Sequence, residues 1–302
     1  MSTERAHLLL VNPSSGGGRT RKLLPEVEAE LRRRGLSFRR MATRSLEHGV
    51  EEARRAAEAG EVPVVMSGDG LIGQVGGALA GTGAAMGIVP GGRGNDLARV
   101  LGIPADPPGA VEVLAEANER EIDVGQANGR RFLCVASIGF DSEANRIANE
   151  ARVVKGNLVY AYAALRAMAA WRPATFSVTV DGGEPLSYTG YSVEVANSGA
   201  FGGGMFVAPH AKLDDGLFDI VVIDSSIGKL RYLTNLPKVF KGTHVHEDGV
   251  IEMRAAGANL TVSADRDFAL YADGEHLTDL PAELRVLPSA LRVIAPPGGP
   301  RA

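Results

Sequence analysis

Residues 62–79 read VPVVMSGDGLIGQVGGAL and contain an apolar strand, a glycine-rich turn and an apolar helix in that order. The run 62–66 is apolar on both faces, which is typical of a buried strand in a parallel sheet. Ile72, Val75 and Leu79 follow at helical spacing. The turn between strand and helix lies at the carboxyl end of the strand, where open α/β sheets bind their ligands.

The segments on both sides repeat this alternation of strand and helix. A helix over 20–34 follows the apolar strand His7–Val11, and Ser45 can cap a second helix. Another buried strand is expected over 85–89. Strands alternating with helices predict a parallel sheet with helices packed on it.

The pattern changes after about Ile122 to short strands with turn residues between them, such as Asn128-Gly129. The ranges expected to be strands are 250–254, 260–264, 268–272 and 284–287, and the ranges expected to be helical are 141–170 and 227–240. We therefore expect an α/β domain over 1–122 and a mainly β domain over 123–288. The final strand, 291–294, would add residues 289–302 to the first domain if it returns there.

Composition and charge exclude several classes of protein. A net charge of −4 over 302 residues argues against a nucleic-acid-binding protein, whose binding domain is usually basic. The single cysteine, Cys134, lies in an apolar strand and indicates a buried thiol in a reducing, cytoplasmic compartment. The N-terminal apolar run is too short for a signal peptide, and the helix at 158–171 is too short for a transmembrane helix. Membrane contact is therefore expected to be peripheral, and the oligomeric state, a homodimer included, stays open.

Two further glycine-rich turns follow the first and last strands of the α/β segment. The first reads NPSSGGGR over 12–19 and the other reads PGGRGND over 90–96. Glycines let backbone N–H groups approach an anion, and Arg19 and Arg93 add positive charge. Neither turn ends in the Gly-Lys-Ser/Thr of a P-loop. Taken alone, the first turn is equally compatible with a flexible loop, and Asp96 is expected to cap the next helix.

Asp69 stands between two glycines in the middle turn. A carboxylate beside phosphates repels them unless a metal ion lies between or a proton is taken up. Asp69 is therefore a candidate for metal-linked or proton-handling chemistry. The alternative is a strand-to-helix turn in which Asp69 serves only as a helix cap.

These three turns, in this order, resemble the catalytic-domain family of the diacylglycerol kinases, which also includes sphingosine and ceramide kinases and bacterial lipid kinases. The resemblance continues along nearly the whole chain. The further motifs are IDVG at 122–125, SIGFD at 137–141, AN at 196–197 with GGG at 202–204, KLDDGLFD at 212–219 and DGE at 273–275. Several motifs in family order are far more specific than any one of them.

The resemblance implies a fold, a reaction and a set of site residues. The fold would be an N-terminal parallel α/β nucleotide-binding domain, related to that of NAD kinases, followed by a C-terminal β-sandwich domain. The activity would be Mg-dependent transfer of phosphate from ATP to a lipid hydroxyl, at the inner face of the membrane. The residues implied to line the nucleotide site are Asn12, Pro13, Ser14, Ser15, Gly16, Thr43, Ser67, Gly68, Asp69, Gly70, Leu71, Ile72, Gly73, Arg93, Asn95 and Asp96.

The same resemblance implies a metal site and a general base in the second domain. Asp215 would bind Mg through its carboxylate, and Lys212 and Leu217 through their carbonyl oxygens. Glu275 would accept the proton of the lipid hydroxyl, with Asp273 and Asp69 as the other candidates. Without the resemblance, the DDG at 214–216 and the DGE at 273–275 would be taken as hairpin turns.

Four positions depart from the commoner family pattern, and other functions stay open. Ser67 and Leu71 replace a Gly and a Thr, as in sphingosine kinases and some bacterial diacylglycerol kinases. Gln74 replaces a Glu, and Arg93 replaces a Thr or Ser. The alternatives are a sphingoid-base kinase, an NAD kinase-like enzyme, and a non-catalytic lipid or nucleotide sensor.

Some charged residues allow two interpretations. Residues 19–44 contain nine Lys or Arg and three Glu, which indicates either a solvated helix face or a surface for anionic lipids. His244 and His246 alternate as on a strand, and we expect both at the surface. Asp123 is equally suited to hold a water molecule on Mg or to pair with an arginine.

Overall fold

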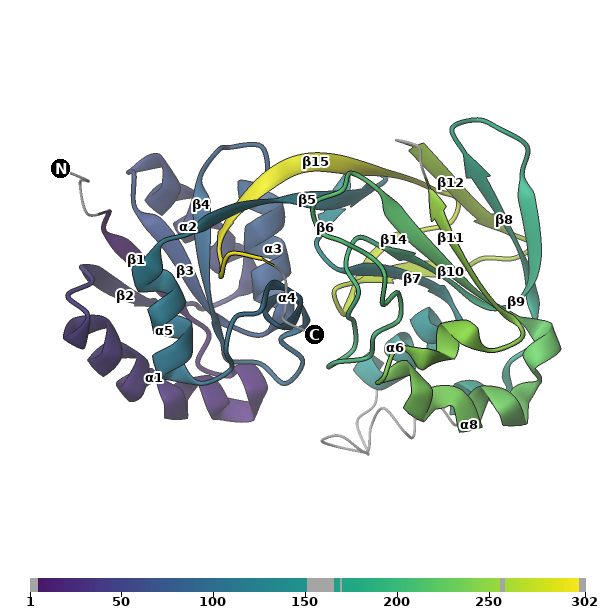
Figure 1. Cartoon of the computed structure of the whole chain (residues 1–302), viewed down its shortest axis with the longest axis horizontal. Helices are drawn as coiled ribbons and strands as arrows, with labels where there is room; N and C mark the ends of the chain where they lie inside the picture. Colours follow the sequence, from purple (N-terminus) through teal and green to yellow (C-terminus); the bar gives the residue numbers. More distant parts are fainter. Residues whose placement is uncertain (1–4, 151–165, 169, 256–258, 299–302) are drawn as a thin grey trace. The chain divides into compact units, whose positions relative to one another are not determined.

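A computed structural model describes the chain except residues 1–4, 151–165, 169, 256–258 and 299–302. The chain divides into two compact units (Figure 1). Unit 1 comprises Met1–Val124, Gly202–Gly204 and Leu287–Ala302, and unit 2 comprises Gly125–Phe201 and Met205–Val286. From the sequence we placed the divisions after residues 122 and 288 and left 202–204 in the second domain.

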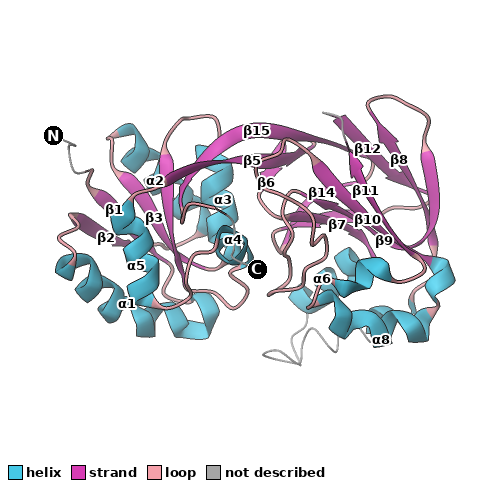
Figure 2. Cartoon of the chain, viewed as in Figure 1, coloured by secondary structure: helices cyan, strands magenta, loops and turns pink. Residues whose placement is uncertain are grey.

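Unit 1 is built on a parallel sheet in the order β2, β1, β3, β4, with helices packed on it (Figure 2). Its strands are β1 (His7–Val11), β2 (Phe38–Ala42), β3 (Val62–Ser67) and β4 (Ala85–Pro90). Its helices are α1 (Ser15–Arg33), α2 (Leu46–Glu58), α3 (Asp69–Leu79), α4 (Asp96–Leu101) and α5 (Pro107–Glu116). The α/β alternation expected from the sequence is confirmed.

The local sequence explains these elements. All residues of β1, β3 and β4 are buried, as continuous apolar runs predict. Ser45 caps α2 by accepting a hydrogen bond from the N–H of His48 at 3.1 Å. In α1, Gly16, Gly17 and Gly18 have positive φ, so the regular helix begins after them.

Strand β15 (Ala282–Ile294) contributes to both units. Its end runs parallel to β4, with Arg292 beside Ala85, so the final strand does return to unit 1. The expected strands 284–287 and 291–294 are therefore one strand. Buried Asp123, on β5 (Glu119–Ala127), accepts a hydrogen bond from the N–H of Ser289 at 2.8 Å.

Unit 2 consists mainly of antiparallel strands, with helical segments beside them (Figure 2). The further strands are β6 (Arg130–Phe132), β7 (Val135–Gly139), β8 (Ala174–Val180), β9 (Leu186–Ala196), β10 (Phe218–Asp224), β11 (Val250–Ala255), β12 (Asn259–Ala264), β13 (Ala269–Ala272) and β14 (Glu275–Asp279). The helices are α6 (Phe140–Glu150) and α8 (Lys229–Val239), with the 3-10 turns η1 (Ser225–Ile227) and η2 (Thr243–His246).

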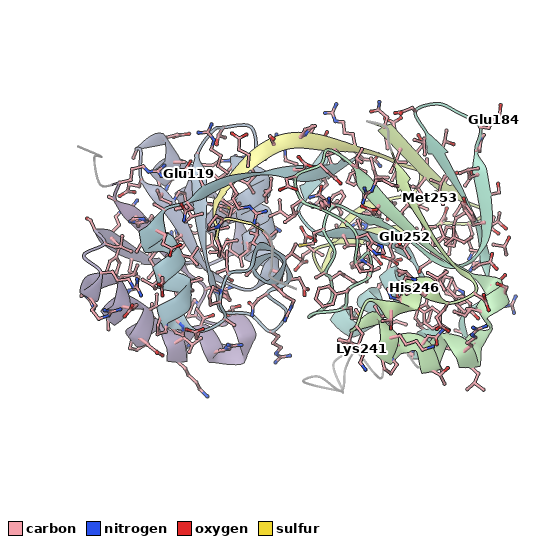
Figure 3. The ribbon with its side chains drawn as sticks, viewed as in Figure 1. Glu119, Glu184, Lys241, His246, Glu252 and Met253 are labelled. Atoms are coloured by element: carbon pink, nitrogen blue, oxygen red, sulfur yellow. The ribbon has the colours of Figure 1, made fainter. Side chains whose placement is uncertain are left out.

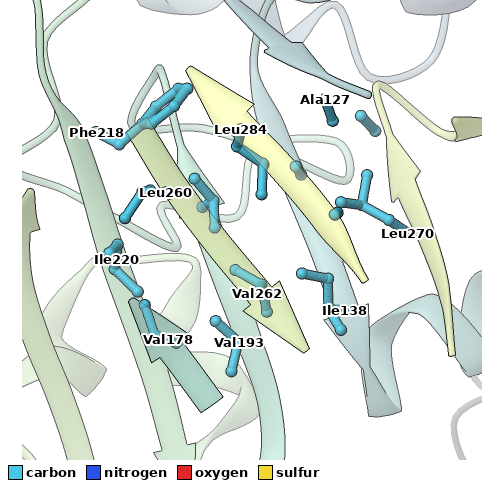
Figure 4. Close-up of a cluster of buried hydrophobic side chains, with 14 of the residues drawn as sticks. Ala127, Ile138, Val178, Val193, Phe218, Ile220, Leu260, Val262, Leu270 and Leu284 are labelled. Carbon is cyan, nitrogen blue, oxygen red and sulfur yellow. The ribbon is translucent and has the colours of Figure 1, made fainter. Parts of the chain in front are cut away.

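The core of unit 2 lies between its strands (Figure 4). Ile138, Val193, Ile220, Val262 and Leu270 are among its fully buried side chains. Burying one such side chain stabilises a fold by about 1.5–3 kcal/mol. Cys134 is also buried, as its apolar surroundings predict.

The structure differs from the sequence-based expectations in the helical parts of unit 2. Helix α6 covers the first third of the expected helix 141–170, and most of the remainder lies outside the described residues. Residues 243–246 form a 3-10 turn, so the strand-like alternation expected for His244 and His246 is wrong. Among the residues that the structure describes, no helix is long and apolar enough to span a bilayer.

Candidate active site

The three glycine-rich loops of unit 1 meet at the carboxyl ends of β1, β3 and β4. The N–H of Gly91 donates to the carbonyl of Ser67 at 2.8 Å, which joins the third loop to the second. Thr20 Oγ1 donates to the carbonyl of Gly91 at 3.2 Å, which joins the first to the third. Segments far apart in the sequence therefore form one glycine-lined surface at the sheet edge where α/β folds bind nucleotides.

Close backbone packing explains two of these glycines. At Gly16, which has a φ of 61°, a Cβ atom would lie 2.5 Å from the carbonyl O of Gly91. At Gly92, a Cβ would lie 2.4 Å from the Cα of Gly68. Contacts this short do not occur for real side chains, so these loops assemble only with glycine at both positions.

Asp69 stabilises the third loop from the second. Its carboxylate accepts the N–H of Asn95 at 2.8 Å and the N–H of Asp96 at 2.7 Å. These are free amides at the start of α4, where a negative charge is also favoured by the helix dipole. Asp69 is thus a helix cap, as the simpler interpretation of the turn predicts, but for α4 and not for its own helix α3.

Asp96 does not cap α4, contrary to the expectation from the sequence. It is 5% exposed, and its carboxylate accepts the N–H groups of Gly203 at 2.8 Å and Gly204 at 2.7 Å. Burial raises the pKa of the Asp96 carboxyl, and the bonds from the two glycines oppose that shift. The expectation failed because the partners of Asp96 lie more than 100 residues further along the chain.

The side chains of the other residues expected at the nucleotide site differ in their exposure to solvent. Arg93 is exposed, and its Nη2 lies 3.3 Å from the position of a Cβ on Gly17, so its charge lies beside the first loop. Leu71 and Ile72 are buried. Their side chains therefore belong to the core of unit 1, and only their backbone is suited to contact a ligand.

The first loop and its neighbours are held by local hydrogen bonds. Asn12 Oδ1 accepts the hydroxyl of Ser14 at 2.8 Å. The N–H of Thr43 donates to the carbonyl of Val11 at 2.8 Å, which places Thr43 at the end of β1. Asn95 Oδ1 accepts the N–H of Gly92 at 2.8 Å and closes the third loop.

The predicted metal site of unit 2 lies in the turn before β10. Asp215 Oδ1 accepts the N–H of Leu217 at 3.2 Å, and Asp215 Oδ2 lies 3.9 Å from Nη1 of Arg254. Arg254 also contacts buried Asp219 at 3.2 Å, and burial raises the pKa of Asp219. The described part of the chain contains no group of three or more His, Cys, Asp or Glu suited to a metal.

A Mg ion still fits the donors of this turn. One partly exposed carboxylate and two backbone carbonyls are hard oxygen ligands, which Mg accepts while it keeps several water molecules. The donors are those of Asp215, Lys212 and Leu217. Arg254 is a competing cation, so this chemistry favours a weakly held ion.

The two acidic residues of the turn between β13 and β14 have different surroundings. Asp273 has a φ of 52°, and its carboxylate accepts the N–H groups of Leu133 at 2.8 Å and Cys134 at 2.9 Å. Glu275 is the exposed first residue of β14, and no described residue forms a hydrogen bond with its carboxylate. Asp273 therefore organises the turn, whereas Glu275 is free to contact a ligand.

The structure also contains a buried polar cluster that the sequence analysis missed. Glu194 on β9 is fully buried beside Asp141, Ser137 and Ser192, and no described residue gives either carboxylate oxygen a well-formed hydrogen bond. Burial, together with the charge of Asp141, raises the pKa of Glu194 well above its usual value. The sequence signal was a lone Glu in the apolar run YSVEVA at 191–196.

His244 is another buried residue, and the expectation of a surface position is wrong. It is 2% exposed, and its Nε2 lies 3.1 Å from the carbonyl O of Val207. Burial lowers the pKa of its imidazole. His246 is exposed, as expected.

Unit 2 contains an open cavity of about 1190 Å³ between α6 and β13. Its apolar wall includes Ile147, Trp171, Phe268 and Leu280. Its other lining residues include the arginines Arg146, Arg166, Arg172 and Arg266. An apolar wall with cationic groups is suited to an amphipathic anionic or polar ligand.

Comparison with known proteins gives this arrangement its family. Residues 6–127 match the model of the diacylglycerol kinase catalytic domain, and residues 134–295 match that of the YegS C-terminal NAD kinase beta sandwich-like domain. A diacylglycerol kinase of Mycobacterium tuberculosis is 34% identical over 298 residues, which cover 96% of this chain and 95% of that protein. The chain belongs to the diacylglycerol kinase family. As a member of that family it is a lipid kinase, and kinases of this family use a nucleotide as phosphate donor.

Other relatives agree with this assignment of family and fold. A diacylglycerol kinase of Staphylococcus aureus is 28% identical, over 95% of this chain and 91% of its own length. The crystal structure of a Bacillus anthracis diacylglycerol kinase superposes with a TM-score of 0.76 at 22% identity, over 98% of both chains. An Archaeoglobus fulgidus NAD kinase in complex with ATP has a TM-score of 0.51 at 13% identity, over 96% of this chain and 92% of its own. The likenesses to solved structures show the shared fold alone.

Proposed function

We propose that this lipid kinase transfers the γ-phosphate of ATP to the free hydroxyl of diacylglycerol and forms phosphatidic acid. The convergence of the three glycine-rich loops in unit 1 carries the proposal, because it presents backbone N–H groups and the Arg93 guanidinium where a polyphosphate would bind. The names of the relatives favour diacylglycerol over a sphingoid base or NAD as the acceptor.

Each group then has a distinct role in the transfer. The lipid oxygen attacks the γ-phosphorus, the bond between that phosphorus and the β–γ bridging oxygen breaks, and ADP leaves. Glu275 takes the hydroxyl proton, because its carboxylate is exposed and the competing carboxylates of Asp69 and Asp273 each accept two backbone amides. Arg93 and the loop amides would offset the negative charge of the phosphates.

Asp215, with the carbonyls of Lys212 and Leu217, would hold the Mg ion. When bound, Mg supplies positive charge that offsets the phosphates. In the chain itself, the Asx-type bond from Leu217 to Asp215 fixes the turn and so keeps the three donors together.

The acyl chains of the substrate are proposed to lie against the apolar wall of the cavity in unit 2. Ligand pockets usually measure about 300–1,000 Å³ and are lined mainly by apolar side chains. The cavity here, at about 1190 Å³, is larger than that range and has Trp171 and Phe268 in its wall. Such a site is suited to a hydrocarbon chain and explains why the acceptor would be a lipid.

A transfer assay tests the proposed reaction. With γ-labelled ATP and a panel of diacylglycerol, a sphingoid base, ceramide and NAD, we expect label on diacylglycerol and none on NAD. Chromatography separates the products. Labelled NADP with unlabelled lipids would contradict the proposal, and label on the sphingoid base alone would change the substrate but keep the class of enzyme.

Asp215→Asn should raise the Mg concentration needed for half-maximal activity about tenfold or more, since one charged ligand is lost while the carbonyl ligands stay. Asp214→Asn is the matched control, because it removes the same charge from the neighbouring exposed position. A Mg titration of both folded variants measures the effect. Equal titrations for Asp215→Asn and the wild type would show that Asp215 serves only the turn.

A further inference from the structure

The exposed apolar residues of unit 2 are concentrated at one helix. Among the described residues, the large hydrophobic side chains that are exposed are Leu230 at 77%, Phe240 at 54% and Leu186 at 46%. Leu230 lies in the first turn of α8, and Phe240 follows its last residue. Figure 1 shows α8 at the outer edge of its unit, beside the strands.

The opposite face of α8 is firmly packed. Tyr232 and Asn235 are buried, and Tyr232 donates a hydrogen bond to Asp141 at 3.1 Å. Tyr232 belongs to the same apolar cluster as Ile147 and Trp171, which also line the cavity. The helix is therefore anchored by one face, and the residues that it exposes are held in place.

The exposed face of α8 also carries positive charge. Lys229, Arg231 and Lys238 lie on the helix, and Lys229 Nζ donates to the carbonyl of Met168 at 3.0 Å. Lys241, which Figure 3 labels, follows Phe240 in the sequence. Arg231 and Lys238 contact Glu247, and Arg231 also contacts Asp248. Lys241 is exposed and forms no ion pair within the described part of the chain.

The basic stretch at residues 19–44 lacks this combination. Five of its nine cations contact glutamates of the same unit, in the pairs Arg32–Glu28, Arg33–Glu30, Arg34–Glu30, Arg39–Glu61 and Arg40–Glu28. Among the described residues, no ion pair involves the other four, Arg19, Arg21, Lys22 and Arg44. None of the exposed large apolar side chains lies on α1 or β2. Because this stretch has no exposed apolar anchor, we favour its interpretation as a solvated face.

We propose that α8, with Phe240 and Lys241, docks the kinase on an anionic phospholipid surface. Leu230 and Phe240 would enter the boundary between headgroups and acyl chains, and Lys241 would face the phosphates. The chain as a whole has a net charge of −4, so an anionic surface repels most of it and local cations decide which face binds. The inference rests on the proposed function, because a kinase acting on diacylglycerol must reach a substrate dissolved in the membrane.

Vesicle sedimentation without ATP tests the docking surface separately from catalysis. The probes are vesicles of phosphatidylglycerol with phosphatidylcholine and vesicles of phosphatidylcholine alone. Wild-type protein should bind the anionic vesicles and dissociate with added salt, since charge attraction is screened over about 10 Å at 0.1 M. Leu230→Ser with Phe240→Ser should weaken that binding about tenfold or more, because two apolar anchors are lost.

Two controls separate this surface from its competitors. Leu186→Ser removes exposed apolar area elsewhere, and Arg39→Gln with Arg40→Gln removes charge from the basic stretch. Both should bind vesicles like the wild type. Undiminished vesicle binding by the Leu230/Phe240 variant would overturn the proposal, as would no preference of the wild type for anionic vesicles.

Activity on a short-chain, water-soluble diacylglycerol keeps the two proposals distinguishable. The Leu230/Phe240 variant should match the wild type on this substrate and lose activity only on vesicle-borne diacylglycerol. If the wild type binds vesicles through α8 but phosphorylates neither substrate, docking stands and the proposed reaction fails. If both proteins phosphorylate both substrates equally, the reaction stands and docking fails.

Discussion

Glu275→Gln is expected to lower turnover about 100-fold to 10,000-fold, which is the usual contribution of a general base. Glutamine keeps the shape of the side chain and cannot accept the proton of the lipid hydroxyl. Glu275 is exposed, and its carboxylate has no hydrogen-bond partner in the described part of the chain, so the fold should not depend on its charge. Initial rates with saturating substrates, ATP affinity and thermal unfolding are the measurements, and only the rate should change.

Asp273→Asn and Asp69→Asn are the matched controls because their carboxylates have structural partners. Each accepts two backbone N–H groups, and an asparagine side chain has one acceptor oxygen. A buried donor left without a partner costs about 1–3 kcal/mol, so both variants should lose thermal stability. Near-normal turnover in Glu275→Gln, with a folded but inactive Asp273→Asn or Asp69→Asn, would assign the base to the other residue.

Gly16→Ala should weaken ATP binding about tenfold or more and lower the free energy of unfolding. An alanine in the left-handed region costs about 1–2 kcal/mol. In addition, its Cβ would lie 2.5 Å from the carbonyl O of Gly91, so the first and third loops would have to separate. Calorimetric titration with ATP and thermal unfolding measure the two effects.

Gly18→Ala is the control for this substitution. Gly18 has a φ of 92°, but no atom lies within 4 Å of the Cβ that an alanine would add there. The control therefore introduces backbone strain in the same loop without separating the loops. If both variants bind ATP equally weakly, backbone strain accounts for the loss and the packing of Gly16 on Gly91 does not.

Most of unit 1 could be predicted because its signals are local. The apolar runs of β1, β3 and β4 specify buried strands, and Ser45 specifies the start of α2 by a hydrogen bond to an N–H three residues away. The glycine loops could be placed because each directly follows one of these strands. Buried strands, helix starts and loop positions of this kind depend only on residues that are neighbours in the sequence.

The partners of the polar side chains could not be predicted. Asp69 was expected either to cap its own helix or to handle metal or protons, and it caps α4 across 26 positions of the sequence. Glu194 was not singled out from the sequence, yet the packing of β7, β9 and α6 buries it beside Asp141. His244 was expected on a strand face and is buried in a 3-10 turn.

The sequence by itself determined the α/β order, the positions of the glycine loops and the likeness to a lipid kinase, because periodicity and ordered motifs are properties of neighbouring residues. Only the tertiary structure decided which carboxylates are occupied by backbone amides and which stay available, as Asp273 and Glu275 illustrate. For α8, the sequence predicted a helix over 227–240, and only the structure showed that Leu230 and Phe240 are exposed. Burial and hydrogen bonding depend on segments that the chain brings together from far apart, and this is why the sequence pattern does not reveal them.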